Sequence, residues 1–152
     1  MNKKIIILIL VSFLFITGCN KNKSITCTST IENKLSDYKI SAEYKITYNS
    51  DYVKTIEKKE QYKMDTEDIK NYIYESKNLE YKNLNDLYGG YQYEVTETEN
   101  EVNVKVFINV EELNIKSMIN DEFLDKYYVK NNKLTLSGLK QFYKSKGIDC
   151  DI

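Results

Sequence analysis

The sequence contains no histidine, arginine, proline or tryptophan. Histidine is the commonest general base and a frequent metal ligand, so its absence removes the usual centre of a hydrolytic or metal-dependent site. Without arginine, no guanidinium group can bind a phosphate or carboxylate through two parallel hydrogen bonds. A net charge of −1 at pH 7 further disfavours binding to nucleic acid. We therefore expect no cofactor, no metal site and no nucleic-acid partner.

A short apolar run opens the chain, from Ile5 to Ile16, directly after Lys3 and Lys4. As a helix it would be about 18 Å long, whereas the hydrocarbon core of a bilayer is roughly 30 Å thick. A buried core helix is the alternative, but the run is apolar on every side and lies at the N-terminus. The pattern is typical of a secretory signal peptide, which we place at residues 1–18.

The residues Ile16, Thr17 and Gly18 stand immediately before Cys19. This spacing resembles the lipobox of bacterial lipoproteins, in which a branched apolar residue and two small residues precede a cysteine. By that resemblance, the Cys19 thiol is alkylated by a diacylglyceryl group and the signal peptide is cut before Cys19. The new amino group can then be acylated, for example with palmitate. Two or more acyl chains give stable anchoring, so we expect the protein on the outer face of the cell membrane.

Lipidation of Cys19 would leave Cys27 and Cys150 as an even pair in an oxidising compartment. The two lie near the ends of the expected domain, and the chain-entropy model gives about 5 kcal/mol for closing a loop of that size. A free reactive thiol and half of a metal site are the competing interpretations. Two thiolates without histidine cannot complete a four-ligand zinc site. We favour a disulfide between Cys27 and Cys150.

Alternation of apolar and polar residues predicts an antiparallel sheet. The alternation covers residues 25–31, 38–48, 52–64, 91–96 and 102–110. Turn residues at 49–51 and 99–100 join the last four segments into two hairpins, which we expect to pair side by side. Tyrosines recur on one face of 38–48. They could form an aromatic platform for a sugar or for peptidoglycan, but we favour the half-buried face of a sheet.

Helical spacing follows the acidic stretch 65–68. The residues at that spacing, which we expect to face the core, are Ile69, Tyr72, Ile73, Ser76, Leu79 or Glu80, Leu84 and Leu87. Asp65 or Thr66 should cap the first amides, and Gly89–Gly90 should end the helix. Asparagines at 78, 83 and 85 predict a break near 78–82.

Two further helical segments are predicted toward the C-terminus. The stretch 113–129 is less regular, and a short last helix runs through Leu136 to Tyr143, begun by Thr135 or Ser137 and ended by Gly147. The expected domain, residues 25–152, is then a single α+β unit of about five antiparallel strands with two to four helices packed against them. Residues 19–24 form a polar tether.

Catalysis finds little support in the sequence. Cys27 and Cys150 are not a Cys-x-x-Cys pair of the kind that a thiol oxidoreductase uses. Carboxylates suited to a hydrolase are plentiful, for example Glu94, Glu97, Glu111 and Glu112, but no pattern pairs them across a cleft. We expect that the protein is not an enzyme.

Several motifs in order resemble the YehR-like family of small bacterial lipoproteins. They are the lipobox at Cys19, Cys27-Thr28, Leu-Tyr-Gly-Gly-Tyr at 87–91, Leu-Thr-Leu-Ser-Gly-Leu at 134–139, and Gly-Ile-Asp-Cys at 147–150. The resemblance covers essentially all of the mature chain. It implies an antiparallel sheet with helices packed against it, and a low-GC Gram-positive source. It supplies no activity and no catalytic residues.

The sequence thus predicts a lipid-anchored binding or interaction module at the cell envelope. Its partner could be an envelope protein, the cell wall or a small ligand.

Overall fold

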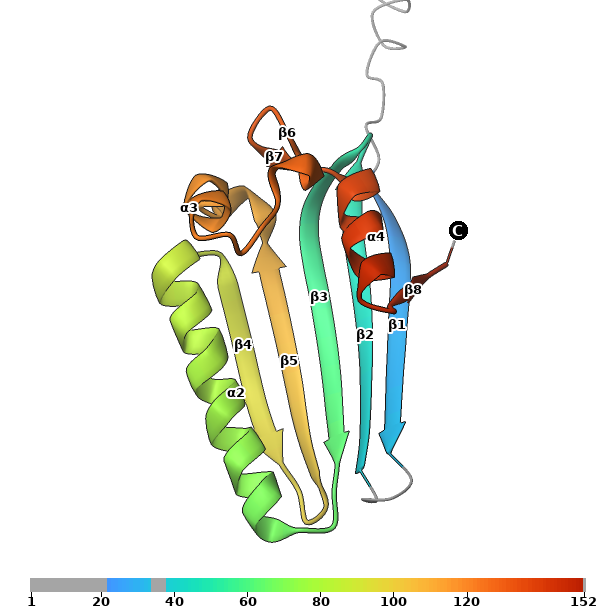
Figure 1. Ribbon diagram of the computed structural model, residues 1–152, viewed down its shortest axis with the longest axis vertical. Coiled ribbons are helices and arrows are strands. Elements are labelled where there is room, and N and C mark those ends of the chain that lie inside the picture. Colours follow the sequence, from blue (N-terminus) through green and yellow to red (C-terminus); the bar gives the residue numbers. More distant parts are fainter. Residues whose placement is uncertain (1–21, 34–37, 152) are drawn as a thin grey trace, which may run out of the picture.

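The computed structural model describes residues 22–33 and 38–151, which fold around one six-stranded antiparallel sheet (Figure 1). The strand order is β4-β5-β3-β2-β1-β8. The strands are β1 (Lys23–Asn33), β2 (Tyr38–Asn49), β3 (Tyr52–Lys63), β4 (Tyr91–Glu97), β5 (Glu101–Asn109) and β8 (Asp149–Cys150). The two hairpins lie side by side through β3 and β5, as expected. The α+β class with an antiparallel sheet is confirmed.

Three α-helices of the described chain pack on one face of the sheet: α2 (Glu67–Tyr88), α3 (Ile115–Asn120) and α4 (Leu136–Ser145). Helix α2 runs along the β4 side, and α4 lies over the half that holds β1 and β2 (Figure 1). Two 3-10 turns, η1 (Val110–Glu112) and η2 (Lys126–Tyr128), and a small hairpin of β6 (Val129–Lys130) and β7 (Lys133–Leu134) complete this layer. The opposite face carries polar side chains, among them the ion pairs Lys45–Glu57 and Lys105–Glu94.

The predicted signal peptide and lipobox, Ile16 to Cys19, lie outside the described residues. Strand β1 begins at Lys23, two residues before the start that we expected for the domain. In the part of the chain that the structure covers, no helix has the length and hydrophobicity needed to cross a membrane.

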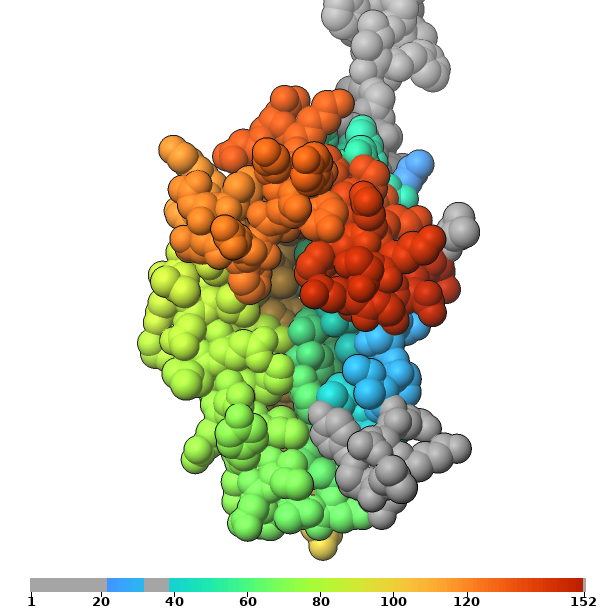
Figure 2. Space-filling model, viewed as in Figure 1, coloured from blue at the N-terminus to red at the C-terminus, as the bar shows by residue number. Residues whose placement is uncertain are grey.

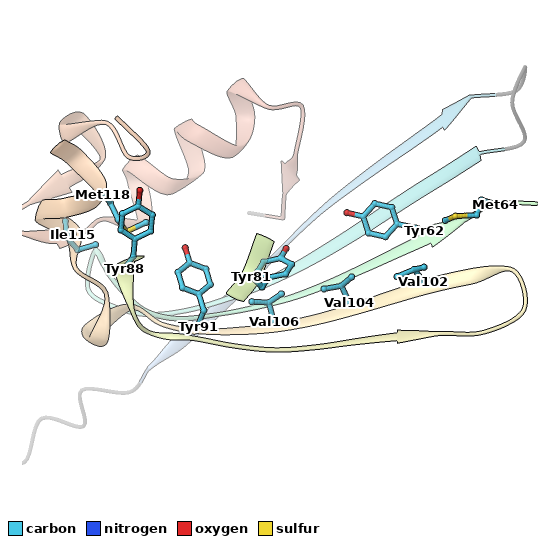
Figure 3. Packing of buried hydrophobic residues seen from close by; sticks show 10 residues of the cluster. All are labelled: Tyr62, Met64, Tyr81, Tyr88, Tyr91, Val102, Val104, Val106, Ile115 and Met118. Atoms are coloured by element: carbon cyan, nitrogen blue, oxygen red, sulfur yellow. The ribbon is translucent and has the colours of Figure 1, made fainter. Parts of the chain in front are cut away.

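The core consists of two clusters on the helix-covered face. The larger lies under α2 and includes Tyr62, Met64, Tyr81, Tyr88, Tyr91, Val102, Val104, Val106, Ile115 and Met118 (Figure 3). The smaller lies under α4 and includes Cys27, Ile46, Val53, Ile56, Val110, Leu134, Leu139 and Tyr143. The half-buried residues Ile108, Leu113 and Leu124 pack against both clusters. Tyr44 of β2 is therefore part of the helix-covered sheet face, because it packs against Tyr143 with ring centroids 4.8 Å apart.

Helix α2 is continuous from Glu67 to Tyr88, so the break predicted near 78–82 is wrong. The tyrosines of its buried face provide the reason, since Tyr81 is buried between Asn78 and Asn83, and Tyr88 is buried just beyond Asn85. Thr66 is the N-cap residue but makes no side-chain capping hydrogen bond. Gly89 ends the helix with a φ of 69°, as expected.

The exposed face of α2 differs from the prediction. Four of the residues that we expected to face the core are exposed: Ile69, Tyr72, Leu79 and Leu87. The prediction of their burial is wrong, because Lys70, Tyr81 and Tyr88 occupy the buried face instead. Of the predicted set, Ile73 and Leu84 do pack against the core.

The segment 113–129, predicted to be helical, contains only the short helix α3 and the 3-10 turn η2. Asn114 caps α3 by accepting a hydrogen bond from the amide of Ser117. Beyond Asn120 the chain folds back, because the amides of Phe123 and Leu124 both donate to the carbonyl of Met118. The last helix begins as predicted, with the Thr135 hydroxyl accepting from the amide of Gly138.

Candidate functional site

A largely apolar cavity of about 430 Å³ lies where the sheet, the segment 113–124 and α4 meet. Figure 2 shows the recess between these segments, with β5 visible at its base. It is lined by Ile56, Tyr91, Ile108, Leu113, Ile115, Met118, Glu122, Phe123, Leu124, Leu134, Leu139, Phe142, Tyr143 and Lys146. The lining residues come from both core clusters, so the cavity lies where the two halves of the core meet.

One wall of the cavity is fixed by close backbone contacts at the start of β4. Gly90 has a φ of 75°, and a Cβ atom there would lie 2.7 Å from the carbonyl oxygen of Asn109. Only glycine permits this approach, which lets the amide of Asn109 donate to the carbonyl of Gly90 at 2.8 Å. The amide of Asn114 bonds the carbonyl of Tyr88 at 2.8 Å. Together these bonds hold the segment that leads into α3 against the sheet.

The other wall is helix α4, which is held at both ends. At its N-terminus, Ser137 donates to the carboxylate of Asp51 at 2.9 Å. Gly138 lies so close to η2 that a Cβ atom would be 2.5 Å from the Cα of Tyr128. At its C-terminus the chain returns to the sheet through β8, where Cys150 is joined to Cys27.

Two buried tyrosines, Tyr91 and Tyr143, are among the lining residues of the cavity. The ring of Tyr91 rises from the sheet toward the helices, with its hydroxyl pointing away from the strands (Figure 3). Burial, with Tyr88 and Glu80 nearby, raises the pKa of Tyr91 to about 12. Burial also raises the pKa of Tyr143 well above its ordinary value. Both phenols are therefore protonated at neutral pH and can donate a hydrogen bond, while Glu122 and Lys146 place exposed charges at the cavity.

A second cluster of polar groups is buried under α2. The Glu60 carboxylate is 8% exposed and accepts three hydrogen bonds. They come from the Lys58 ammonium at 2.9 Å, the Tyr81 hydroxyl at 2.8 Å and the Tyr62 hydroxyl at 3.1 Å. Lys58 also donates to the Tyr81 hydroxyl at 2.8 Å.

Electrostatics hold this cluster in its ionised form. Burial alone would raise the pKa of Glu60, but the charge and hydrogen bond of Lys58, the charge of Lys77 and the Tyr81 hydrogen bond together lower it. Burial and the Glu60 charge raise the pKa of Tyr44 to about 12. Because both carboxylate oxygens already accept hydrogen bonds, the cluster has the character of a structural network rather than of a reactive site.

The structure forms the disulfide that the cysteine count favoured, between Cys27 on β1 and Cys150 on β8. The two residues are direct partners in the register of these strands, and Cys27 is fully buried. The bond closes a sequence separation of 123 residues.

The four glutamates that we considered for a hydrolase are not brought together. Glu94 and Glu97 lie along β4, whereas Glu111 and Glu112 lie in η1, beyond the end of β5. Glu94 is paired with Lys105 and Glu111 with Lys54, and Glu112 accepts from the Asn109 side chain at 2.7 Å. None of the four lines the cavity.

Sequence reasoning missed both buried features. Lys58 and Glu60 have the same strand parity as Ile56 and Tyr62, so their inward orientation was readable from the alternation. The cavity had no comparable signal, because its lining comes from segments far apart in the sequence.

The fold defines a class: a six-stranded antiparallel sheet with helices on one face. Two solved structures share it. The chain is similar to the Escherichia coli protein YehR, with 17% identity over 86% of this chain and 91% of that one, and a TM-score of 0.58. It is also similar to a protein from Streptococcus pneumoniae TIGR4, with 11% identity over 87% and 86% of the two chains, and a TM-score of 0.54. The resemblance to YehR is thus confirmed at the level of the fold. No protein-family model and no curated protein matches the chain.

Proposed function

We propose that this protein is a lipid-anchored binding module on the outer face of the bacterial cell membrane, which holds a small, largely apolar ligand in the cavity between α3, α4 and the sheet. The cavity is the observation that carries the proposal. Protein interiors are packed as densely as organic crystals, and ligand pockets are typically apolar spaces of about 300–1,000 Å³ with a few polar groups. A cavity of about 430 Å³ falls within that class.

The lining indicates the chemistry of the ligand. Aliphatic and aromatic side chains from three segments favour an apolar body, while Tyr91 and Tyr143 can each donate a hydrogen bond. A ligand with an aliphatic or aromatic body and one hydrogen-bond acceptor would satisfy both features. With no nucleophile and base placed together at the cavity, binding is the function that its residues support, and we propose no enzymatic activity.

The register of the sheet supports a position of the cavity close to the membrane. Lys23 begins β1 at the end of the sheet where β3 and β4 also begin. A lipid on Cys19 would be four residues away, about 14 Å at full extension. Such an anchor would hold this end of the sheet, with the cavity residues Ile56 and Tyr91, toward the bilayer. The turn at Glu99–Asn100 would then face away from it.

Filling the cavity should abolish ligand binding. We expect N-phenyl-1-naphthylamine, a neutral apolar fluorophore, to bind the wild-type protein at one saturable site. In Leu124→Trp the added indole would occupy the space, and we expect the affinity to fall at least about tenfold, a loss of about 1.4 kcal/mol. A fluorescence titration measures this. Ile31→Trp, which adds the same group at an exposed position on β1, should bind like the wild type.

Unchanged binding in Leu124→Trp, or an equal loss in Ile31→Trp, would contradict the assignment of the site. Circular dichroism of each variant shows whether the fold is kept. Saturable binding to a folded Leu124→Trp variant therefore counts directly against the cavity.

The anchor has its own test. Wild-type protein expressed in a Gram-positive host should sediment with membranes and be released by detergent, because acyl chains hold it there. Cys19→Ala removes the thiol that would be alkylated, so we expect this variant in the soluble fraction after washing without detergent. Intact mass measurement of both proteins reports the lipid. A Cys19→Ala protein that still sediments fully with membranes would overturn the anchor.

A further inference from the structure

Two side chains of opposite charge line the apolar cavity, one on each of two walls. Glu122 belongs to the segment that folds back after α3, and Lys146 is the C-cap residue of α4. Both residues are exposed, so their charged groups lie at the open rim of the cavity rather than in its apolar interior. The rim therefore carries one negative and one positive charge.

Neither charge is neutralised within the part of the chain that the structure describes. There, no ion pair joins Glu122 to Lys146 or either of them to another residue. The Lys146 ammonium lies 5.7 Å from the ring centroid of Phe142, which also lines the cavity. The position of Glu122 is set by its backbone, whose amide donates to the carbonyl of Ile119 at 3.2 Å. Both charges are thus available to a ligand.

The cavity also contains polar groups without a partner in the described chain. Tyr91 and Tyr143 line it and are only 8% and 6% exposed. Among the described residues neither hydroxyl makes a hydrogen bond, and every side-chain oxygen or nitrogen that is closed off from solvent does make one. The two hydroxyls therefore reach the open space of the cavity. Because buried polar groups are normally hydrogen-bonded, these hydroxyls suit a ligand that carries an oxygen acceptor.

We propose that the ligand of this cavity is a free α-amino acid with a large apolar side chain, whose carboxylate pairs with Lys146 and whose ammonium pairs with Glu122. This inference rests on the function proposed above, since it names the ligand class of the same cavity. In an α-amino acid both charges are attached to one carbon atom. They can therefore stay at the rim while the side chain enters the apolar interior.

Ligands with other charges fit the rim less well. A carboxylate alone, as in a fatty acid, would be attracted by Lys146 and repelled by Glu122, and an amine alone would meet the reverse. An uncharged ligand would cover both charged groups without replacing their contacts with water. In a longer peptide the two terminal charges lie at opposite ends of the molecule. The free amino acid is the small apolar ligand that gives each charge an opposite partner.

A matched series of ligands tests this assignment. L-Phenylalanine, 3-phenylpropanoate and 2-phenylethylamine share one aromatic body and carry both charges, the carboxylate alone or the ammonium alone. Isothermal titration at neutral pH measures the dissociation constant of each ligand for the wild-type protein. We expect L-phenylalanine to bind at least about fivefold more tightly than either relative, because it gains two charged contacts and meets no repulsion. It should also displace N-phenyl-1-naphthylamine, which places it in the cavity.

Two variants identify the partner of each charge. Lys146→Gln should weaken the binding of L-phenylalanine and 3-phenylpropanoate at least about threefold but not that of 2-phenylethylamine. Glu122→Gln should weaken the binding of L-phenylalanine and 2-phenylethylamine to a similar extent but not that of 3-phenylpropanoate. Lys144→Gln is the matched control, since Lys144 is an exposed lysine in the last turn of α4 that does not line the cavity. It should bind all three ligands as the wild type does.

Several results would overturn the proposal: no measurable binding of L-phenylalanine, equal binding of the three ligands, or tighter binding of the anion or of the cation. An effect of Lys144→Gln as large as that of Lys146→Gln would do so too. Each of these results can occur while N-phenyl-1-naphthylamine still binds at one saturable site that Leu124→Trp removes. Failure of the proposed function is recognised separately, because that saturable site is then missing.

Discussion

Replacing Glu60 by alanine is expected to lower the free energy of unfolding by about 3–5 kcal/mol, because it breaks a buried ion pair and leaves one partner without compensation. The Lys58 ammonium would remain in the core without its carboxylate, and the hydroxyls of Tyr62 and Tyr81 would lose their acceptor. A protein of this size is stable by only about 5–15 kcal/mol. The loss is measured by urea unfolding at neutral pH.

Glu57→Ala is the matched control for this measurement. Glu57 lies on the same strand and also pairs with a lysine, Lys45, but on the exposed face and at 3.4 Å. Exposed ion pairs contribute about 0–1 kcal/mol, so this variant should unfold almost as the wild type does. Equal destabilisation by Glu57→Ala and Glu60→Ala would show that the burial of the Glu60 network does not add to the stability of the protein.

The same network makes stability depend on pH. The folded state lowers the pKa of Glu60 below its ordinary value of 4.5. The stabilisation that this carboxylate provides is therefore fully present above that value and is lost as pH falls through the lowered folded-state pKa. In Glu60→Gln this part of the acid sensitivity should disappear, so the stability of the variant should fall less steeply below pH 4.5 than that of the wild type.

Removing the disulfide with Cys27→Ser and Cys150→Ser together should cost about 2–5 kcal/mol of unfolding free energy. The bond closes 123 residues of chain, so its loss greatly enlarges the conformational freedom of the unfolded state. It also joins β8 to β1 through a register of only two residue pairs. The end of α4 that leads into β8 should then open more readily.

Thermal unfolding with and without reductant checks this expectation. Reductant should lower the unfolding temperature of the wild type toward that of the double variant, and it should leave the double variant unchanged. A wild-type protein whose unfolding temperature does not respond to complete reduction, verified by thiol alkylation and mass, would contradict the stabilising role of the bond.

The strands and the cysteine pair could be predicted from the sequence. Alternation of apolar and polar residues is a local pattern, and the cysteines only have to be counted. Alternation along β2 and β5 marks an inward face residue by residue. Two cysteines near the ends of the domain can be predicted to form a disulfide without knowledge of the path that the chain takes between them. The two-residue strand β8 is too short to show such a pattern, and it pairs with β1 at Cys27–Cys150 and Thr28–Asp149.

The buried face of helix α2 could not be predicted from the sequence. Its spacing supports two different apolar stripes, and the sequence could not decide which of them faces the sheet. The choice was made by Tyr81 and Tyr88, whose rings reach Tyr93 and Phe123 from other segments. Large amphipathic rings can be buried where their hydroxyls find partners, and Tyr81 finds Glu60.

The sequence by itself determined the α+β class, the hairpins and the even pair of cysteines, because period and composition act along the chain. Only the tertiary structure decided which face of α2 is buried, that Tyr81 of this helix joins Lys58 and Glu60, and where the cavity between α3 and α4 lies. Each of these depends on contacts between residues far apart in the sequence, and such contacts leave no periodic trace in either partner.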